Sequence, residues 1–200
     1  WRTQYTHCVP VAVNVSPLQL LDPRFPQLVA HMLQSCGVAP QWLTLEITES
    51  SAVQNLEQTT VQVEQLRVMG VHVAMDDFGT GFSSLNMLRS LRLHTVKIDR
   101  GLIDPLPSPD AVAVVRAICQ LADALHLHVV AEGVETQEQA SAARDAGCGE
   151  LQGYLYSKPR LAQDVGMWLT RRAMEHGGDT EAVPYSPLSL GHEETQQVPL

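Results

Sequence analysis

Short apolar runs alternate with longer amphipathic segments along most of this chain. The apolar runs lie at residues 11–15, 43–48, 71–75, 95–98, 128–131 and 151–156, and their length is typical of strands buried in a parallel sheet. Between them, apolar residues recur at helical spacing, which predicts helices at about 25–35, 54–69, 84–91, 111–125, 136–147 and 161–174. Regular alternation of strands and helices predicts an α/β fold built on a parallel sheet.

The alternating pattern stops after about residue 175. Residues 176–200 contain Gly177-Gly178 and three prolines, with no sustained periodicity, which is typical of a disordered tail or a linker. The preceding length is sufficient for one domain with a hydrophobic core. We therefore predict one domain over residues 1–175 and a disordered C-terminal tail over residues 176–200.

Each predicted strand carries one polar residue on the face opposite its aliphatic side chains. Side chains alternate between the two faces of a strand, so helices would cover the aliphatic face and the polar residues would lie inside a parallel barrel. Polar residues near the carboxyl ends of such strands meet at one rim, where barrel enzymes carry out their chemistry. The set is Asn14, Glu46, Asp76, Lys97, Glu132 and Gln152, with Asp77 beside Asp76.

Carboxylates dominate this set, and they indicate a metal site. Asp76 and Asp77 repel each other unless a cation lies between them, and carboxylate and amide oxygens suit Mg²⁺ or Mn²⁺. Lys97 could hold a phosphate or a metal-bound hydroxide. Each residue also has an ordinary alternative, such as a turn, a cap or a solvated ion pair, and it is their joint occurrence on successive strands that favours a site.

Composition excludes some classes of function. The formal net charge of −9 argues against binding a nucleic-acid polymer. The sequence has no secretory signal pattern and no apolar run long enough to cross a membrane, so we predict a cytoplasmic domain, although a parent protein could be membrane-anchored. The cysteines show no C-x-x-C spacing, and we predict that they are buried free thiols rather than disulfides or zinc ligands. They are Cys8, Cys36, Cys119 and Cys148.

Six short motifs resemble those of the EAL-domain family of cyclic-di-GMP phosphodiesterases. They occur in the family's order and extend over most of residues 11–159. The motifs are 11–17 (Val-Ala-Val-Asn-Val-Ser-Pro), 45–50 (Leu-Glu-Ile-Thr-Glu-Ser), 76–84 (Asp-Asp-Phe-Gly-Thr-Gly-Phe-Ser-Ser), 96–100 (Val-Lys-Ile-Asp-Arg), 131–136 (Ala-Glu-Gly-Val-Glu-Thr) and 152–155 (Gln-Gly-Tyr-Leu). The resemblance implies a (β/α)8 TIM-type barrel with one reversed strand, and metal-dependent hydrolysis of cyclic-di-GMP to linear pGpG.

The resemblance also implies roles for individual residues. A first metal, Mg²⁺ or Mn²⁺, would be held by Asn14, Glu46 and Asp76, and Asp76 and Asp77 would bridge to a second. The remaining site residues would be Lys97 at the nucleophilic water, Glu132 as second-metal ligand or general base, Gln152 supporting that water or metal, and Glu135 as a supporting acid. Two metals at such a site activate water and stabilise both the attacking and the leaving oxygen.

A loop after the Asp76-Asp77 pair carries the regulatory part of the resemblance. Glu49 would anchor this loop, which in the family couples dimerisation to activity. The loop residues so assigned are Phe78, Gly79, Thr80, Gly81, Ser83 and Ser84. We therefore expect a homodimer, and the family pattern also allows GGDEF or sensory domains upstream in a parent chain.

One departure from the family pattern concerns the N-terminal part of the domain. The Glu-Ala-Leu motif that names the family, and the arginine two residues after it, do not occur in this chain. We therefore expect a fragment of about six β/α units, with unpaired sheet edges and weak metal binding on its own. Two alternatives to a catalytic domain stay open: a non-catalytic cyclic-di-GMP-binding module and an inactive truncated product.

Overall fold

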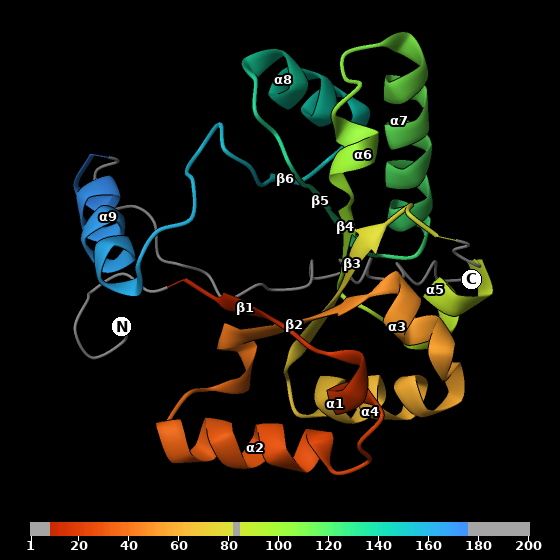
Figure 1. Ribbon diagram of the computed structural model, residues 1–200, viewed down its shortest axis with the longest axis vertical. Helices are drawn as coiled ribbons and strands as arrows, with labels where there is room; N and C mark the ends of the chain where they lie inside the picture. The colour runs from red at the N-terminus through yellow and green to blue at the C-terminus, as the bar shows by residue number, and fades with distance from the viewer. Residues whose placement is uncertain (1–8, 82–84, 176–200) are drawn as a thin grey trace, which may run out of the picture.

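Six parallel strands form one curled sheet in the computed structural model, which describes residues 9–81 and 85–175. Strands adjacent in the sequence are adjacent in the sheet, and each neighbouring pair is parallel. The strands are β1 (Val11–Asn14), β2 (Leu43–Thr48), β3 (His72–Phe78), β4 (Thr95–Ile98), β5 (His128–Ala131) and β6 (Glu150–Leu151). The sheet is a half-barrel, which confirms the predicted parallel α/β class (Figure 1).

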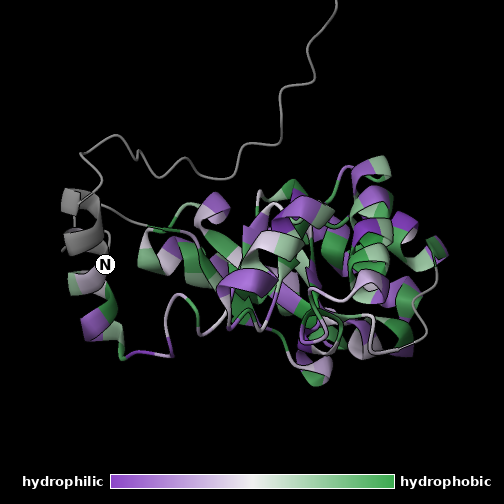
Figure 2. Cartoon of the chain, turned by 90° about the horizontal axis from the view of Figure 1, so that it is seen from above, coloured by the Kyte–Doolittle hydropathy of each residue, from purple (hydrophilic) through white to green (hydrophobic). Residues whose placement is uncertain are grey.

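Helices connect successive strands, and one further helix follows the last strand (Figure 1). They are α1 (Pro17–Leu20), α2 (Phe25–Cys36), α3 (Glu49–Gln54), α4 (Leu56–Val68), α5 (Leu85–Leu91), α6 (Arg100–Ile103), α7 (Pro109–Ala124), α8 (Gln137–Ala146) and α9 (Ala162–Glu175), with a 3₁₀ turn at Pro40–Trp42. The last helix, α9, stands away from the sheet in two perpendicular views (Figures 1 and 2). Over the described residues, no helix combines the length and the apolar character that a membrane span requires.

The hydrophobic core lies between the aliphatic face of the sheet and the helices. Ile47, Val73 and Ile98 on the strands are at most 1% exposed, as are Val63 of α4 and Val115 of α7. Hydrophobic and hydrophilic residues lie side by side on the same helices (Figure 2), as amphipathic helices that cover a sheet require. This burial fixes which face of each strand points away from the helices, and so determines where the polar residues lie.

The structure corrects several predicted boundaries. The strand predicted to end at Met75 continues to Phe78, because β3 still pairs with β4 beyond the two aspartates. The helix predicted over 54–69 is interrupted at Asn55, whose side chain accepts a hydrogen bond from the Gln58 amide and caps α4, so that α3 is a separate helix. The strand predicted over 151–156 ends at Leu151, since a turn follows in which the Tyr156 amide donates to the Gly153 carbonyl.

The cysteine prediction is partly confirmed. Cys119 and Cys148 are buried free thiols, whereas Cys36 at the end of α2 is exposed, so its predicted burial is wrong. Position 36 is the last residue of its helix, and only Phe25, Pro26 and Val29 of α2 are buried. Cys8, Ser83, Ser84 and the predicted tail over 176–200 lie outside the described residues.

Candidate active site

One lysine ammonium joins three carboxylates at the carboxyl ends of neighbouring strands. The Lys97 Nζ atom lies 2.8 Å from Glu46 Oε1, 3.0 Å from Asp76 Oδ1 and 2.7 Å from Glu132 Oε1. Glu46 belongs to β2, Asp76 to β3 and Lys97 to β4, while Glu132 directly follows β5. None of the four side chains is more than 16% exposed. The structure thus brings together four of the residues that strand alternation predicts at this rim.

Burial and ion pairing shift the pKa values of these groups in opposite directions. Burial alone would lower the pKa of Lys97, but its ion pairs with Glu132, Glu46 and Asp76 prevail and hold the pKa above its ordinary value. Burial raises the pKa of Glu132 to about 6, against the lowering effect of Lys97 and with a further raising effect of Asp76. Lys97 is therefore a permanent cation here, and Glu132 is a carboxylate whose basicity is increased by its surroundings.

Asp77 joins the same cluster through an irregularity in β3. Strand alternation alone would send two consecutive side chains to opposite faces. Met75 pairs with Val96 and Phe78 with Ile98, so β3 holds one residue more than β4 over this stretch, which is a β-bulge.

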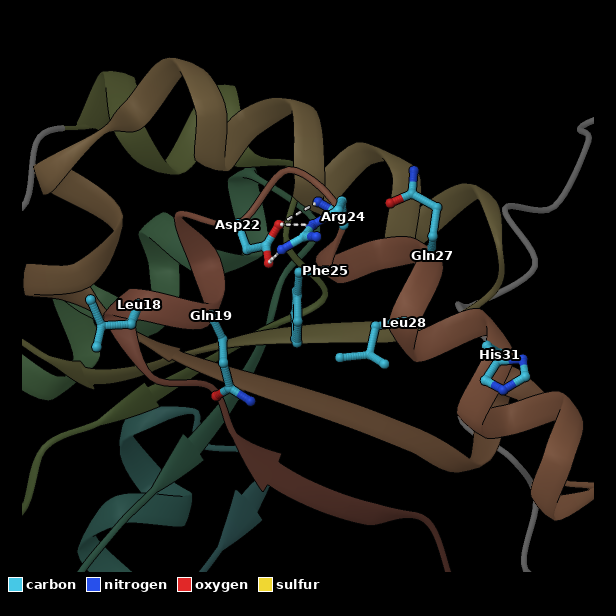
Figure 3. Close-up of a pocket in the computed structure, with 8 residues that line it drawn as sticks. All are labelled: Leu18, Gln19, Asp22, Arg24, Phe25, Gln27, Leu28 and His31. Carbon is cyan, nitrogen blue, oxygen red and sulfur yellow. Dashed lines mark hydrogen bonds and ion pairs between the residues drawn. The ribbon is translucent and has the colours of Figure 1, made fainter.

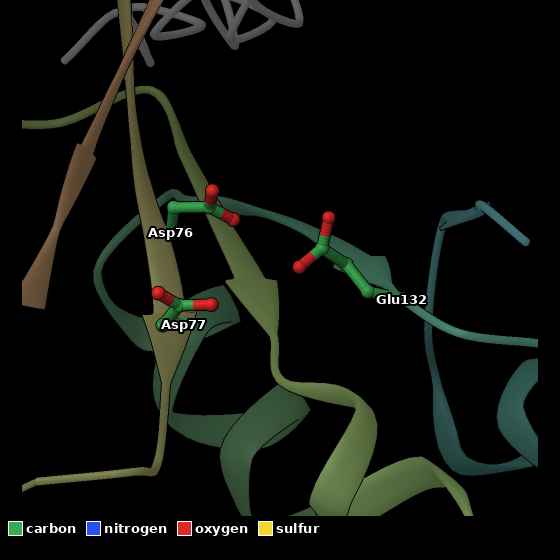
Figure 4. A group of neighbouring side chains, drawn as sticks. All are labelled: Asp76, Asp77 and Glu132. Atoms are coloured by element: carbon green, nitrogen blue, oxygen red, sulfur yellow. The ribbon is translucent and has the colours of Figure 1, made fainter. Parts of the chain in front are cut away.

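The irregularity has a clear consequence for the carboxylates. Asp77 has a φ of 55°, a left-handed conformation that aspartate tolerates better than most residues. Carboxylate oxygens of Asp76, Asp77 and Glu132 consequently lie within 4.8 Å of one another (Figure 4). Burial raises the pKa of Asp77, and the nearby Asp76 and Asp99 raise it further, against a lowering effect of Lys97.

Glu49 lies beneath the loop that follows the aspartates. It is 2% exposed, and its Oε2 atom accepts a hydrogen bond of 3.2 Å from the Gly79 amide. The Thr80 hydroxyl donates to the Asp77 carbonyl at 2.9 Å, which closes the turn. A Cβ atom added at Gly81 would lie 2.9 Å from Glu49 Oε1, so the loop packs directly on this carboxylate. Glu49 thus contacts the loop at Gly79 and Gly81, and its role as the anchor of a regulatory loop stays a prediction.

The other predicted residues are at the border of the cluster. Asn14 is in register with Glu46 but is exposed, since β1 is the edge strand of the described sheet. Gln152 also has an exposed side chain, and its backbone is fixed by hydrogen bonds from its amide to the Ala131 carbonyl and from the Val134 amide to its carbonyl. The structure therefore places both residues at the border of the cluster.

Glu135 has a partner that sequence reasoning did not assign. Its Oε1 atom lies 3.0 Å from Nη1 of Arg100, and Arg100 also pairs with Asp104 one helical turn away. Arg100 is the last residue of the Val-Lys-Ile-Asp-Arg motif, so the motif could have drawn attention to it. Its pairing with Glu135 could not be predicted, because an exposed arginine at the start of a helix has no distinctive sequence pattern. The ion pair connects the segment after β5 to α6.

Two of the cavities on the described surface differ in their relation to the charged cluster. One, of about 580 Å³, is on the concave side of the sheet, and Glu46, Lys97 and Gln152 are among the residues that line it, together with His72 and Thr95 nearer the other ends of the strands. The other, of about 720 Å³, lies along α1 and α2 beside the ion pair of Asp22 and Arg24, and contains none of the candidate residues (Figure 3). The concave cavity is therefore the one that reaches the charged cluster.

The donor set fits divalent cations. Formally, the Glu46, Asp76, Asp77 and Glu132 carboxylates face a single ammonium, that of Lys97, and this excess of negative charge is costly in a partly buried place. Converging carboxylate oxygens are the ligands that Mg²⁺ and Mn²⁺ prefer. The fold and the cluster together form a candidate site for divalent cations at the strand ends, where barrel enzymes carry their active sites.

Comparison with known proteins identifies the family. A model of the EAL domain matches residues 1–159, and the chain belongs to this family. The bifunctional diguanylate cyclase/cyclic di-GMP phosphodiesterase MucR of Pseudomonas aeruginosa is 42% identical over 156 residues, which cover 78% of this chain and 23% of MucR. The chain spans about a fifth of the length of the first curated relatives that it matches.

Solved structures confirm the fold. The EAL domain of Mycobacterium smegmatis DcpA superposes with a TM-score of 0.80 at 40% identity, over 85% of this chain and 77% of that one. The BlrP1 protein of Klebsiella pneumoniae, in a complex with manganese and cyclic-di-GMP, superposes with a TM-score of 0.70 at 30% identity, over 75% of this chain and 39% of that one. The half-barrel described here therefore corresponds to a part of the EAL barrel.

Proposed function

We propose that this chain is part of the catalytic domain of a phosphodiesterase that hydrolyses cyclic-di-GMP to linear pGpG in bacterial second-messenger signalling. Its support is the ionic cluster in which Lys97 contacts Glu46, Asp76 and Glu132, with Asp77 brought in by the bulge of β3. Membership of the EAL family, and the ligand and metal named for the BlrP1 complex, support the proposed substrate and ion class.

The metal ligands follow from the donor set. We assign Asp76, Asp77, Glu132 and Glu46 as carboxylate ligands of Mg²⁺ or Mn²⁺, and Asn14 as an amide ligand beside Glu46. Bound divalent ions would supply a water activated as a nucleophile and charge stabilisation at the phosphate. The chain's own residues would then orient these groups and handle the protons.

Two residues are suited to the proton and charge transfers. Glu132, with a pKa of about 6, is mostly ionised at neutral pH and basic enough to accept a proton from an attacking water. The Lys97 ammonium directs its three N–H donors at three carboxylates, and on releasing one of them it could donate a hydrogen bond to that water or to a phosphate oxygen without losing its charge. Gln152 would support that water or the metal, and Glu135 would be a supporting acid in the segment beside the cluster.

An assay of the complete parent protein tests this function. With Mg²⁺ or Mn²⁺, the parent should convert cyclic-di-GMP into pGpG, and Glu132→Gln should reduce the rate by about 10²–10⁴-fold. Glu57→Gln is the matched control, because Glu57 is exposed on α4. Product formation would be followed by chromatography and ligand binding by calorimetry.

Other results would contradict the catalytic proposal. Micromolar binding of cyclic-di-GMP without any turnover would favour the alternative of a non-catalytic binding module. Neither binding nor turnover, in a parent that is folded, would favour an inactive product. The predicted homodimer, upstream GGDEF or sensory domains and cytoplasmic location stay predictions, to be tested by light scattering, by the parent's sequence and by cell fractionation.

A further inference from the structure

Two cysteines from different elements lie in contact away from the candidate active site. Cys119 is on α7, and Cys148 follows Gly147, the residue that ends α8. Their Sγ atoms are 3.7 Å apart, and the two residues are 7% and 5% exposed. A Cβ atom added at Gly147 would lie 3.1 Å from the Cys119 Cβ, so α7 packs closely on this turn.

The surroundings of the pair are apolar and fixed. Val115 and Ala122 of α7 and Ala143 and Ala146 of α8 belong to the same buried core. The Cys148 amide donates to the Ala143 carbonyl, which fixes the turn. The sulphur atoms are held in contact by backbone structure, and a modest approach would bring them to the bonding distance of about 2.05 Å.

We propose that Cys119 and Cys148 are a peroxide-sensitive pair that forms an intramolecular disulfide, joining α7 to the turn between α8 and β6. The oxidant is a hydroperoxide, and hydrogen peroxide is small enough to reach a buried thiol. The described residues contain one other cysteine, Cys36, which is exposed on α2 and has no thiol partner there. Disulfides of this kind in reducing compartments are usually transient and redox-sensing.

The chemistry balances with the peroxide as the only added reagent. The Cys119 sulphur attacks one peroxide oxygen, the O–O bond breaks, and a sulfenic acid and water form. The Cys148 sulphur then attacks the Cys119 sulphur, the S–S bond forms, the S–O bond breaks, and the departing hydroxide takes the Cys148 proton as a second water. The thiols together lose two electrons, and these reduce the peroxide.

The pair is asymmetric in a way that assigns the order of attack. The hydrogen bond with Cys148 lowers the pKa of Cys119, against a raising effect of burial. The same hydrogen bond raises the pKa of Cys148, and burial adds to this. Since thiolates react with peroxides, Cys119 is oxidised first and Cys148 is the resolving thiol.

The disulfide would restrain a segment that leads into the active site. Cys148 is followed by Gly149, whose amide donates to the Val129 carbonyl of β5, and then by β6. Gln152 comes immediately after β6, and its amide donates to the Ala131 carbonyl. Oxidation therefore fixes the approach to Gln152 against α7, and it should raise the thermal unfolding temperature because it closes a loop of 29 residues.

Peptide mapping tests the proposal on the full chain, and on the complete parent protein where the chain is part of one. The protein is reduced, freed of reductant, treated with hydrogen peroxide and digested without reduction, in a background with Cys8→Ser and Cys36→Ser. The expected result is a linked peptide containing Cys119 and Cys148, a mass loss of two hydrogens, and an unfolding temperature that reductant returns to its initial value.

Single variants distinguish the proposed order from random oxidation. Cys148→Ser should accumulate sulfenic acid at Cys119 that dimedone traps, whereas Cys119→Ser should leave Cys148 reduced at the same dose. Serine is close to cysteine in size, and circular dichroism would establish that each variant is folded. The proposal is overturned if the folded protein keeps both thiols reduced after peroxide treatment. It is also overturned if Cys148→Ser and Cys119→Ser are labelled equally by dimedone.

Discussion

Gly153 illustrates how one backbone contact determines the position of a site residue. A Cβ atom at this position would clash with the backbone N, C and O atoms of Val134. The same two segments exchange hydrogen bonds, from the Val134 amide to the Gln152 carbonyl and from the Leu155 amide to the Val134 carbonyl. Gly153 thus permits the close approach that holds Gln152 beside the segment containing Glu132 and Glu135.

Gly153→Ala should therefore destabilise the fold and displace Gln152. Backbone atoms cannot move aside as a flexible side chain can, so we expect a loss of about 1–3 kcal/mol in the free energy of unfolding. Urea denaturation measures it. Gly149→Ala is the matched control, because a Cβ atom there would meet only the Val129 carbonyl oxygen at 3.8 Å. Equal stability of the two variants would contradict the close-approach argument.

Lys97 makes a second prediction at the same scale. Lys97→Met keeps much of the side-chain volume but leaves Glu46, Asp76 and Glu132 without their shared cation. Uncompensated buried charges should cost about 3–5 kcal/mol of stability at neutral pH. Thermal or urea unfolding in the absence of divalent ions is the measurement. Lys158→Met, at an exposed position, is the control and should change the free energy of unfolding by less than about 1 kcal/mol. An equally small effect of Lys97→Met would contradict the conclusion that Lys97 stabilises the three carboxylates.

At the scale of elements, the amino ends of β3, β4 and β5 carry a group of histidines. The rings of His72 and His94 stack with centroids 4.6 Å apart, and His94 Nδ1 accepts a hydrogen bond of 3.1 Å from the Val73 amide. Burial lowers the pKa of His94 to about 4, and the neighbouring His72, Arg67 and His128 lower it further. The folded protein therefore holds His94 neutral.

This neutral histidine makes stability depend on pH. The pKa of His94 is about 4 in the folded protein against an ordinary 6.5, so below pH 6.5 the unfolded chain binds the proton more readily and stability falls until about pH 4. We expect His94 to account for about 1–3 kcal/mol of this loss, allowing for solvent screening of a partly exposed ring.

Comparing variants separates the contribution of His94 to the pH dependence of stability from that of the carboxylates, which titrate over a similar pH range. His94→Gln can still accept the hydrogen bond from Val73 but cannot be protonated, so its stability should fall less between pH 6.5 and 4. His31→Gln, at an exposed position on α2, should behave like the natural chain. Parallel curves for all three proteins in urea titrations would rule out the role of His94.

The elements also show what the sequence can predict and what it cannot. β2, β4 and β5 have the predicted bounds, because their apolar runs end at turn or polar residues. The bulge in β3 has no counterpart in periodicity, since it depends on the register against β4. The site was predictable as a set of polar rim residues, whereas the ion pairs of Lys97 and the Arg100–Glu135 contact required the packing of several elements.

At the scale of the whole molecule, β1 is an exposed edge. Within the described chain it pairs with β2 alone, and Val11 and Val13 are 41% and 46% exposed. An apolar edge strand with unpaired backbone groups is a template for association with another strand. The four residues of β1 include no charged residue and no proline of the kind that usually protects such strands, and Pro10 lies just before the strand.

The 200-residue chain on its own should therefore self-associate as its concentration rises, and Val13→Lys should reduce this. Sedimentation velocity over a concentration series measures the effect. Val114→Lys is the matched control, because Val114 is also 46% exposed but lies on α7. If the chain is monomeric at every concentration, or if both lysine variants behave alike, β1 is not the associating surface.

The extra residue in β3 has a consequence for anyone who wishes to transplant this site into another barrel. Copying the Asp76-Asp77 pair onto a regular strand would aim one carboxylate at the helices. The graft must also copy the mismatch in strand length: Asp76 and Asp77 lie between Met75 and Phe78, whereas Lys97 alone lies between their partners Val96 and Ile98. A β3 that kept both aspartates but paired regularly with β4 would turn one of the two carboxylates towards the helices. The position of the extra residue is therefore as necessary to this site as the two carboxylates themselves.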